Sequence, residues 1–396
     1  MIETKHDPSY LLETPFHSRV SEACKTNHWE DWAGYTTPSS YKDVELEYFS
    51  CRNTAGVFDL SPMTKYRITG PDAHAYLDHL VTRDLSKLKA GRVMYCCWCN
   101  EDGQVMDDGT IFCLSENDFR LCAQERHLDW LLWSALGFDV NIVDETSEVA
   151  ALALQGPTSC ATLKAMGISG VENLKPFDAK EFTLDETTLF VSRTGFTGDL
   201  GYELWTDPGH AEDLWDRIFT AGENYNIRPM GSEALSIARI EAGFIQAGVD
   251  FVPALNAVRP GRTRSPYELG LGWLVNLNKP NFTGKQALVQ EKQNGSRFRF
   301  VKLDVTGDKP AEHSFIYDKN GNEVGTVTSA VWAPTAKRNI AFASMVMPWG
   351  LPGDNLSAEI YYFRELTWKR VMEPCSVIEG AIFDHERKRL TPAPDF

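Results

Sequence analysis

The chain has 396 residues, of which 43% are hydrophobic and 11% aromatic, so it can bury more than one core and exceeds the usual length of a single domain. Its formal net charge of −16 opposes extended binding to nucleic-acid phosphates, which draws its affinity from clustered Lys and Arg. It has neither an uncharged apolar run of about 18 residues nor a basic, apolar N-terminus, so we expect a cytoplasmic protein without membrane or nucleic-acid partners.

Strand and helix patterns alternate along the first two thirds of the chain. Segments rich in β-branched and aromatic residues predict strands, and apolar residues at three- to four-residue spacing predict helices. The predicted strands are 66–68, 92–97, 110–113, 148–154 and 188–193, and the predicted helices are 72–81, 125–135, 211–223 and 232–242.

The last third of the chain has a different character. Residues 252–266 carry three prolines without periodicity, which predicts a long loop. Strand signals dominate after about Arg297, and Asn320-Gly321 predicts a turn between two of them. We therefore predict a first region over 1–289 and a separate all-β domain, a small barrel, over 290–396.

Three clustered cysteines, Cys96, Cys97 and Cys99, resemble a metal site at first sight. No second cysteine pair or spaced histidine pair accompanies them, and the neighbouring apolar residues favour a buried strand. The total of nine cysteines is odd and lacks a repeating spacing, which predicts reduced thiols. We expect no metal.

Seven short motifs follow one another along the chain. They are residues 56–63 (Gly-Val-Phe-Asp-Leu-Ser-Pro-Met), 82–88 (Thr-Arg-Asp-Leu-Ser-Lys-Leu), 100–108 (Asn-Glu-Asp-Gly-Gln-Val-Met-Asp-Asp), 155–157 (Gln-Gly-Pro), 193–203 (Arg-Thr-Gly-Phe-Thr-Gly, then Gly-Tyr-Glu), 239–243 (Arg-Ile-Glu-Ala-Gly) and 282–288 (Phe-Thr-Gly-Lys-Gln-Ala-Leu). Each alone is weak, because short Gly and Asp motifs are common in turns. In this order and spacing, the chain resembles the glycine-cleavage aminomethyltransferases.

The resemblance implies an α+β, three-lobed fold around a central channel that binds tetrahydrofolate. Two intertwined lobes would form 1–289, and a C-terminal β-barrel would close one side. Tetrahydrofolate would accept a one-carbon unit. Asp108 matches the family's acidic residue beside the accepting nitrogen, Glu203 the carboxylate that hydrogen-bonds the amino-pyrimidine edge of the pterin, and Tyr95 a tyrosine of the folate pocket.

These roles agree with the chemistry of the side chains. A fixed carboxylate at Asp108 would stabilise the positive charge that passes through the site, and a carboxylate at Glu203 accepts two hydrogen bonds from a paired N–H edge. Each residue also has a structural alternative. Asp107 and Asp108 would simply form a turn, Glu203 would be an exposed strand carboxylate, and Tyr95 would pack in a core.

Several positions depart from the family pattern or have weaker roles. Gln124 and Phe196 stand at folate-side positions where asparagine and tyrosine are usual, and Leu235 stands where the family has an arginine. Arg239 would bind the anionic tail of the folate, or would instead pair with Glu233 or Glu241.

The continuation after Asp108 is more similar to folate-dependent demethylases of the same fold. Trp29, Trp32 and Tyr35 would suit a methylated onium donor through cation–π attraction, or would be core aromatics. We therefore predict methyl transfer from a small sulfonium, ammonium or methyl ether donor to tetrahydrofolate, by a monomer or homodimer. The alternatives are the aminomethyltransferase of the glycine cleavage system, which takes an aminomethyl donor, and a non-catalytic folate-binding protein.

Overall fold

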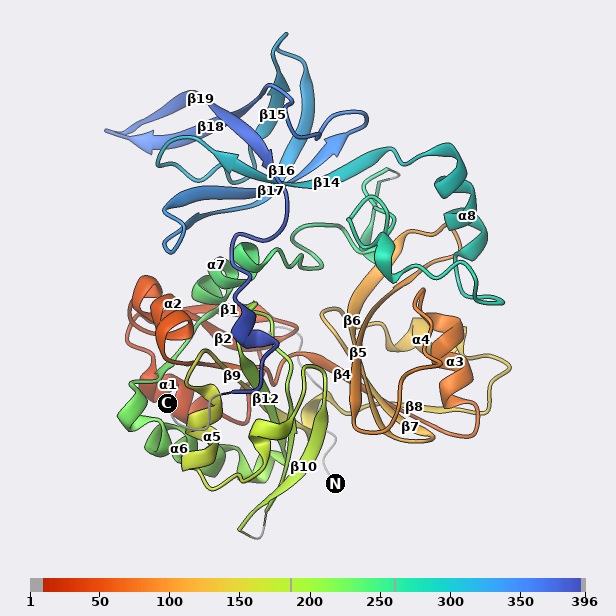
Figure 1. The fold of residues 1–396 in the computed structure, drawn as a ribbon, viewed down its shortest axis with the longest axis vertical. Helices are drawn as coiled ribbons and strands as arrows, with labels where there is room; N and C mark the ends of the chain where they lie inside the picture. Colours follow the sequence, from red (N-terminus) through yellow and green to blue (C-terminus); the bar gives the residue numbers. More distant parts are fainter. Residues whose placement is uncertain (1–9, 186, 260, 393–396) are drawn as a thin grey trace. The chain divides into compact units, whose positions relative to one another are not determined.

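The computed structural model describes residues 10–185, 187–259 and 261–392 (Figure 1). The first nine residues, on which the expectation of no secretory signal largely depends, lie outside this range. Within it, no helix is both long and apolar enough to cross a membrane. The chain divides into two compact units, and each is described by itself: residues 1–66, 144–236 and 385–396 form the first, and residues 67–143 and 237–384 form the second.

The first unit is built on a six-stranded sheet of order β10-β11-β12-β9-β3-β13. Neighbouring strands run antiparallel except β13 and β3, which run parallel. A separate hairpin of β1 and β2 precedes the sheet in the chain. The elements are α1 His17–Ala23, β1 His28–Trp32, β2 Tyr35–Ser40, α2 Val44–Asn53, β3 Gly56–Asp59, β9 Ala150–Gln155, α5 Ser159–Ala165, β10 Ala179–Leu184, β11 Thr187–Ser192, β12 Gly201–Thr206, α6 Ala211–Ala221 and β13 Arg228–Pro229.

The core of the first unit explains why these segments form these elements. All six residues of β9 are buried, as expected for a strand covered on both faces. In α6, Leu214, Trp215 and Ile218 recur at helical spacing and join the same core as Leu152 and Leu204 of the sheet. Strand β9 ends at Gln155 and helix α5 begins at Ser159, so Pro157 lies in the short turn between them.

The second unit contains most of a five-stranded sheet of order β5-β6-β7-β4-β8. Strand β4 (Thr64–Thr69), strand β8 (Asn141–Asp144) and helix α7 (Ser232–Ala242) have residues in both units. The remaining elements before the barrel are α3 Ala73–Leu80, β5 Arg92–Cys99, β6 Val105–Ser115, β7 Asp118–Ala123, α4 Leu128–Ser134 and α8 Lys285–Asn294. The predicted helices at 72–81 and 232–242 and the predicted strand at 92–97 are therefore confirmed.

The long segment between α7 and α8 packs against β5 and β6. Phe251, Leu271 and Phe282 form one buried cluster with Cys97 and Val105 of these strands. At the described positions, 252–259 and 261–266, the predicted loop is confirmed, apart from the short 3-10 helix η5 (Ala254–Asn256). Position 260 lies outside the described residues. A loop without regular structure can lie along the sheet because its apolar side chains anchor it there.

The C-terminal strands form a closed barrel of order β14-β17-β16-β15-β18-β19, which confirms the predicted barrel. Alternate residues of β14, namely Val301, Leu303 and Val305, face the barrel core, as the two-residue period of a strand requires. The domain boundary at 289/290 stays a prediction. The strands are β14 Phe298–Val305, β15 Phe315–Asp318, β16 Glu323–Ala333, β17 Arg338–Val346, β18 Leu356–Arg364 and β19 Thr367–Ile378.

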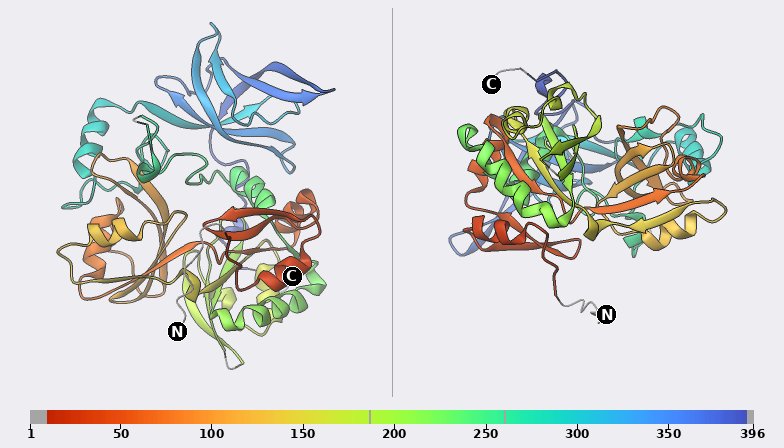
Figure 2. Two further views of the ribbon diagram at one scale, coloured as in Figure 1. Left: turned by 180° about the vertical axis from the view of Figure 1, so that it is seen from behind. Right: turned by 90° about the horizontal axis from the view of Figure 1, so that it is seen from below.

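The hairpin of β18 and β19 extends beyond the barrel wall (Figures 1 and 2). Strand β15 pairs with β18 only up to Glu359, whereas β18 and β19 pair with each other as far as Arg364 and Thr367. The outer part carries Phe363 and Trp368, whose rings lie 5.6 Å apart although both side chains are mostly exposed. We call residues 361–370 the outer ribbon.

Candidate functional site

Asp108 lies in the middle of strand β6, with Tyr95 on the neighbouring strand β5. The register places Cys97 directly opposite Asp108, and Tyr95 is two residues from Cys97. Tyr95 therefore points to the same face of the sheet, at a diagonal that an aromatic side chain can span. Its hydroxyl donates a hydrogen bond to Asp108 Oδ2 at 2.5 Å. This bond fixes one oxygen of the carboxylate.

The preceding residue, Asp107, has a structural task. Its side chain is fully buried. Its Oδ1 accepts from the backbone N–H of Asp108 at 2.8 Å, and its Oδ2 accepts from that of Glu125 at 2.9 Å. Both aspartates belong to a regular strand, so the alternative that they form a turn is wrong. Neighbouring acids thus differ in role: Asp107 braces the backbone, and Asp108 is half-buried on the other face.

The surroundings of Asp108 make its ionisation harder than that of a carboxyl group in water. Burial raises the pKa of Asp108 to about 7, the negative charges of Asp107 and Asp250 add to this rise, and the hydrogen bond from Tyr95 opposes it. A cation next to Asp108 would reverse the balance, because opposite charges favour the ionised carboxylate. The site is therefore suited to receive positive charge.

Two residues that the sequence reasoning missed complete the surroundings of Tyr95. The rings of Tyr95 and Trp273 lie 6.0 Å apart, and Trp273 remains 64% exposed. Arg83 lies over the Trp273 ring at 5.5 Å and donates to the backbone carbonyl of Tyr95 at 2.8 Å. Arg83 belongs to the motif at 82–88, which could have identified it, but Trp273 lies in a 3-10 turn without a periodic signal.

Gln124 is brought close to Asp108 through strand β7. This strand ends at Ala123, which pairs with Gly109. Gln124 comes one residue later, so its backbone reaches the level of Asp108. The structure thus brings three of the predicted residues, Asp108, Tyr95 and Gln124, together in one sheet.

Glu203 lies in the other unit, on β12, opposite Ser192 of β11. Its Oε2 accepts hydrogen bonds from Thr194 Oγ1 at 2.5 Å and from Ser192 Oγ at 3.4 Å. Burial raises the pKa of Glu203 to about 7, and the two hydroxyl groups partly offset that rise. Glu203 is half-buried, so the alternative of an exposed strand carboxylate is wrong. Phe196 belongs to the same unit and is also half-buried, in the turn before β12.

Arg239 on α7 makes a buried clamp within the second unit. Its Nη1 donates to Asp250 Oδ2 at 2.5 Å and to the Phe244 carbonyl at 3.2 Å, and its Nη2 donates to Ser329 Oγ at 2.9 Å. The side chain is only 2% exposed. An ion pair was one of its two predicted roles, but the partner is Asp250, not a glutamate of the helix. Its role in folate binding stays a prediction.

The three aromatics proposed for an onium donor do not share one face. Trp32 pairs directly with Tyr35 across the hairpin of β1 and β2, whereas Trp29 is three residues away on the same strand and points to the opposite side. Trp29 lies 5.5 Å from the ring of His17, and Trp32 lies 5.7 Å from the ring of Phe58. The three rings therefore cannot meet one donor from the same side of the hairpin.

The cysteine cluster is part of strand β5, as predicted. Cys96, Cys97 and Cys99 are fully buried. Burial raises the pKa of each thiol above its usual value. These side chains are therefore protonated at neutral pH and serve the packing of the strand.

Comparisons with known proteins identify the family. The model of the GCVT N-terminal domain matches residues 18–279, and that of the glycine cleavage T-protein C-terminal barrel domain matches residues 299–375. The chain belongs to the glycine cleavage T-protein family. It is 32% identical over 356 residues to the aminomethyltransferase of Lysinibacillus sphaericus, covering 88% of this chain and 94% of that protein.

Two further relatives extend the comparison. The aminomethyltransferase of Caldanaerobacter subterraneus is 32% identical over 344 residues, covering 86% of this chain and 87% of that protein. The crystal structure of the glycine cleavage system aminomethyltransferase T from Bartonella henselae superposes with a TM-score of 0.83 at 26% identity, covering 94% of this chain and 98% of that chain. The predicted fold, tetrahydrofolate as acceptor and the enzyme class are confirmed.

Proposed function

We propose that the protein is an aminomethyltransferase, which passes the one-carbon unit of an aminomethyl donor to tetrahydrofolate. The observation that carries this proposal is the half-buried carboxylate of Asp108, which Tyr95 fixes and whose acidic neighbours would be offset by a cation. The relatives are named aminomethyltransferases, which favours this alternative over our prediction of a small methylated donor. They also speak against a non-catalytic folate-binding protein.

Asp108 would act through its charge. Transfer from an aminomethyl group passes positive charge through the site, and a fixed anion in a water-poor pocket stabilises it without reorganising. Tyr95 keeps Oδ2 in place, and this fixes the orientation of the carboxylate toward the reacting centre. Because its pKa is near 7, Asp108 can also hold or release a proton at neutral pH.

The residues present fit tetrahydrofolate, which supplies the nitrogen that accepts the one-carbon unit. The adjoining rings of Tyr95 and Trp273 offer a flat aromatic surface for a heterocycle. At Glu203, both recorded hydrogen bonds end on Oε2, so within the described residues Oε1 keeps its capacity to accept an N–H group.

A second candidate is methyl transfer from a small methylated molecule. Two observations favour it: Leu235 and Phe196 stand where the resemblance implies polar residues, and both are half-buried. A loss of polar contacts at these positions would alter how the acceptor is held. Trp29, Trp32 and Tyr35 do not together support this candidate, because they lie on two faces of the hairpin.

The test supplies purified protein with tetrahydrofolate and one donor at a time. The donors are an aminomethyl-loaded lipoyl carrier protein, methylated amines, sulfonium compounds and aryl methyl ethers. Formation of 5,10-methylenetetrahydrofolate from the carrier, lost in Asp108→Asn, is the expected result. Formation of 5-methyltetrahydrofolate from a small donor would support the second candidate, and the absence of folate binding would contradict both.

A further inference from the structure

One outer face of the barrel, formed by β15, β18 and β19, exposes large apolar side chains. Phe315 pairs with Glu359, and Glu359 pairs with Met372, so these three residues form a row across the three strands. Further residues follow along β18 at two-residue spacing on the same face, because Ala358 and Ile360 point into the barrel core. We define the aromatic face as the exposed side chains of Phe315, Tyr361, Phe363, Trp368 and Met372.

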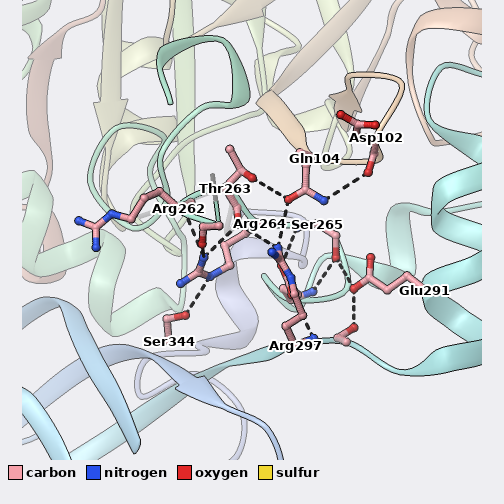
Figure 3. Close-up of polar contacts among 12 residues, drawn as sticks. Asp102, Gln104, Arg262, Thr263, Arg264, Ser265, Glu291, Arg297 and Ser344 are labelled. Atoms are coloured by element: carbon pink, nitrogen blue, oxygen red, sulfur yellow. Dashed lines mark hydrogen bonds and ion pairs between the residues drawn. The ribbon is translucent and has the colours of Figure 1, made fainter. Parts of the chain in front are cut away.

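The chain itself covers another part of the barrel. Arg264 Nε donates to Ser344 Oγ on β17 at 3.1 Å (Figure 3), and its guanidinium lies 3.7 Å from the centre of the Phe298 ring on β14. Ile240 of α7 lies in one buried cluster with Phe342 of β17. By contrast, the hydrogen bonds, ion pairs and ring contacts of the described side chains on the aromatic face stay within β15, β18 and β19. Within the described chain, this face therefore stays open to solvent.

The tip of the outer ribbon adopts a backbone conformation that its residues do not favour. Glu365 and Leu366 join β18 to β19 and have φ angles of 52° and 63°. Two positive φ angles are typical of a type I′ turn, in which Asn and Gly are preferred because a Cβ is disfavoured in the left-handed region. Leu366 is also 89% exposed. Strain together with an exposed apolar side chain does not stabilise the hairpin, and it indicates that Leu366 serves a contact outside the hairpin.

The charges around the aromatic face distinguish between possible partners. The face is neutral, because Arg370 Nε lies 2.5 Å from Glu359 Oε1 on the same face. Arg364 and Lys369 each follow an aromatic residue by one position and therefore point to the opposite face of the hairpin. The net charge of −16 would repel an anionic membrane, and an acidic protein would gain no free cation on this face. A second acidic copy of the chain meets the least repulsion where both surfaces are neutral.

We infer that the aromatic face is a dimer interface, against which the same face of a second copy of this chain packs about a twofold axis. Side chains of this size have an accessible area of about 150–250 Å² each, so burial of the aromatic face and Leu366 would hide roughly 700 Å² per copy at their present exposures. The total of roughly 1,400 Å² lies within the range of about 1,200–2,000 Å² that stable, specific interfaces bury. Aromatic residues and Met are also enriched in such interfaces. The inference does not depend on the proposed function.

Sedimentation velocity of the full chain over a concentration range of about 0.5–50 µM tests the interface. We expect a reversible dimer with a dissociation constant of about 10 µM or below, since interfaces of this size reach micromolar affinity or better. Phe363→Ser/Trp368→Ser should raise that constant at least about 30-fold, because buried aromatic residues carry much of the binding energy. The matched control, Leu132→Ser/Trp133→Ser, removes exposed apolar side chains of α4 and should change the constant less than about threefold. High salt should not raise the constant, because it screens the repulsion between acidic copies.

A second ribbon variant keeps the test decisive if the serine variant does not fold. Glu365→Asn/Leu366→Gly supplies the preferred turn, so the temperature of thermal unfolding should not fall, while loss of the Leu366 contact should raise the dissociation constant about fivefold. A wild type that stays monomeric throughout, or a dimer that survives in both ribbon variants or weakens equally in the α4 control, would overturn the inference. A monomeric wild type that sediments with equimolar phosphatidylserine–phosphatidylcholine vesicles, with this binding lost in the ribbon variants, would assign the face to a lipid surface instead.

Discussion

The two candidate carboxylates, Asp108 and Glu203, have similar pKa values, but different neighbours contribute to the pKa of each. Burial raises the pKa of each to about 7. Two further acids, Asp107 and Asp250, raise that of Asp108, whereas the neighbours of Glu203 are hydroxyl groups that lower it. A carboxylate among other negative charges is stabilised by a nearby cation. A buried carboxylate among neutral groups is stabilised by hydrogen-bond donors. The difference indicates that Asp108 is suited to charge that develops during transfer, and Glu203 to binding a neutral N–H edge.

The largest expected effect concerns Asp250, one of the two acids that raise the pKa of Asp108. Arg239→Met would leave Asp250 buried without its cation, and removing one partner of such a pair costs about 3–5 kcal/mol. We expect the free energy of unfolding, measured by urea denaturation, to fall by this amount. Arg338→Met, which breaks an exposed pair with Asp304, is the control and should cost less than about 1 kcal/mol. Equal losses would show that the Arg239 clamp contributes no more than a surface pair.

Asp108→Asn separates transfer from binding. Loss of a preorganised charge should lower kcat about 100- to 1,000-fold, while the Kd for tetrahydrofolate changes less than about threefold. Steady-state kinetics and calorimetry measure the two quantities. The matched control is Asp102→Asn, in the exposed turn before β6. A variant that loses folate affinity but keeps kcat would give Asp108 the binding role.

Glu203→Gln should produce the opposite pattern. The substitution replaces one accepting oxygen by an NH₂ group, which cannot accept a hydrogen bond from the N–H edge of the pterin. A hydrogen bond to a charged group contributes about 1.5–3 kcal/mol. We therefore expect Kd to rise about 10- to 100-fold without a change in thermal unfolding. Glu181→Gln, an exposed glutamate of β10 in the same sheet, should leave the affinity unchanged.

The smallest effect concerns pH. If ionised Asp108 is required, kcat/KM of the wild type should increase as the pH rises through about 7, because the carboxylate is charged above its pKa. The Tyr95 hydrogen bond lowers that pKa, so Tyr95→Phe should move the midpoint upward, by less than about one pH unit. A midpoint that stays fixed or moves downward would argue that this limb reports another group.

Much of the arrangement follows from patterns along the chain. Tyr95 and Asp108 share one face of the sheet because Tyr95 is two residues from Cys97, which pairs with Asp108. Asp108 belongs to the motif at 100–108, and the family resemblance pointed to Tyr95. The partners of Arg239 and the Trp273 ring beside Tyr95 could not be predicted from these patterns. We expected Arg239 to pair with Glu233 or Glu241 of the same helix, whereas Asp250 reaches Arg239 from an irregular segment. Trp273 is likewise placed by long-range packing, which no local period encodes.

The outer ribbon of the barrel implies unequal local stability. The hydrogen bonds that close the barrel join β15 to Leu356–Glu359 and β14 to Cys375–Ile378. Among the described strands, the backbone of residues 361–370 therefore pairs only within the hairpin of β18 and β19. A two-stranded hairpin alone is marginally stable in water. Backbone amides of the ribbon should therefore exchange with solvent deuterium through a local opening, while those of the closed barrel exchange only when the whole domain unfolds.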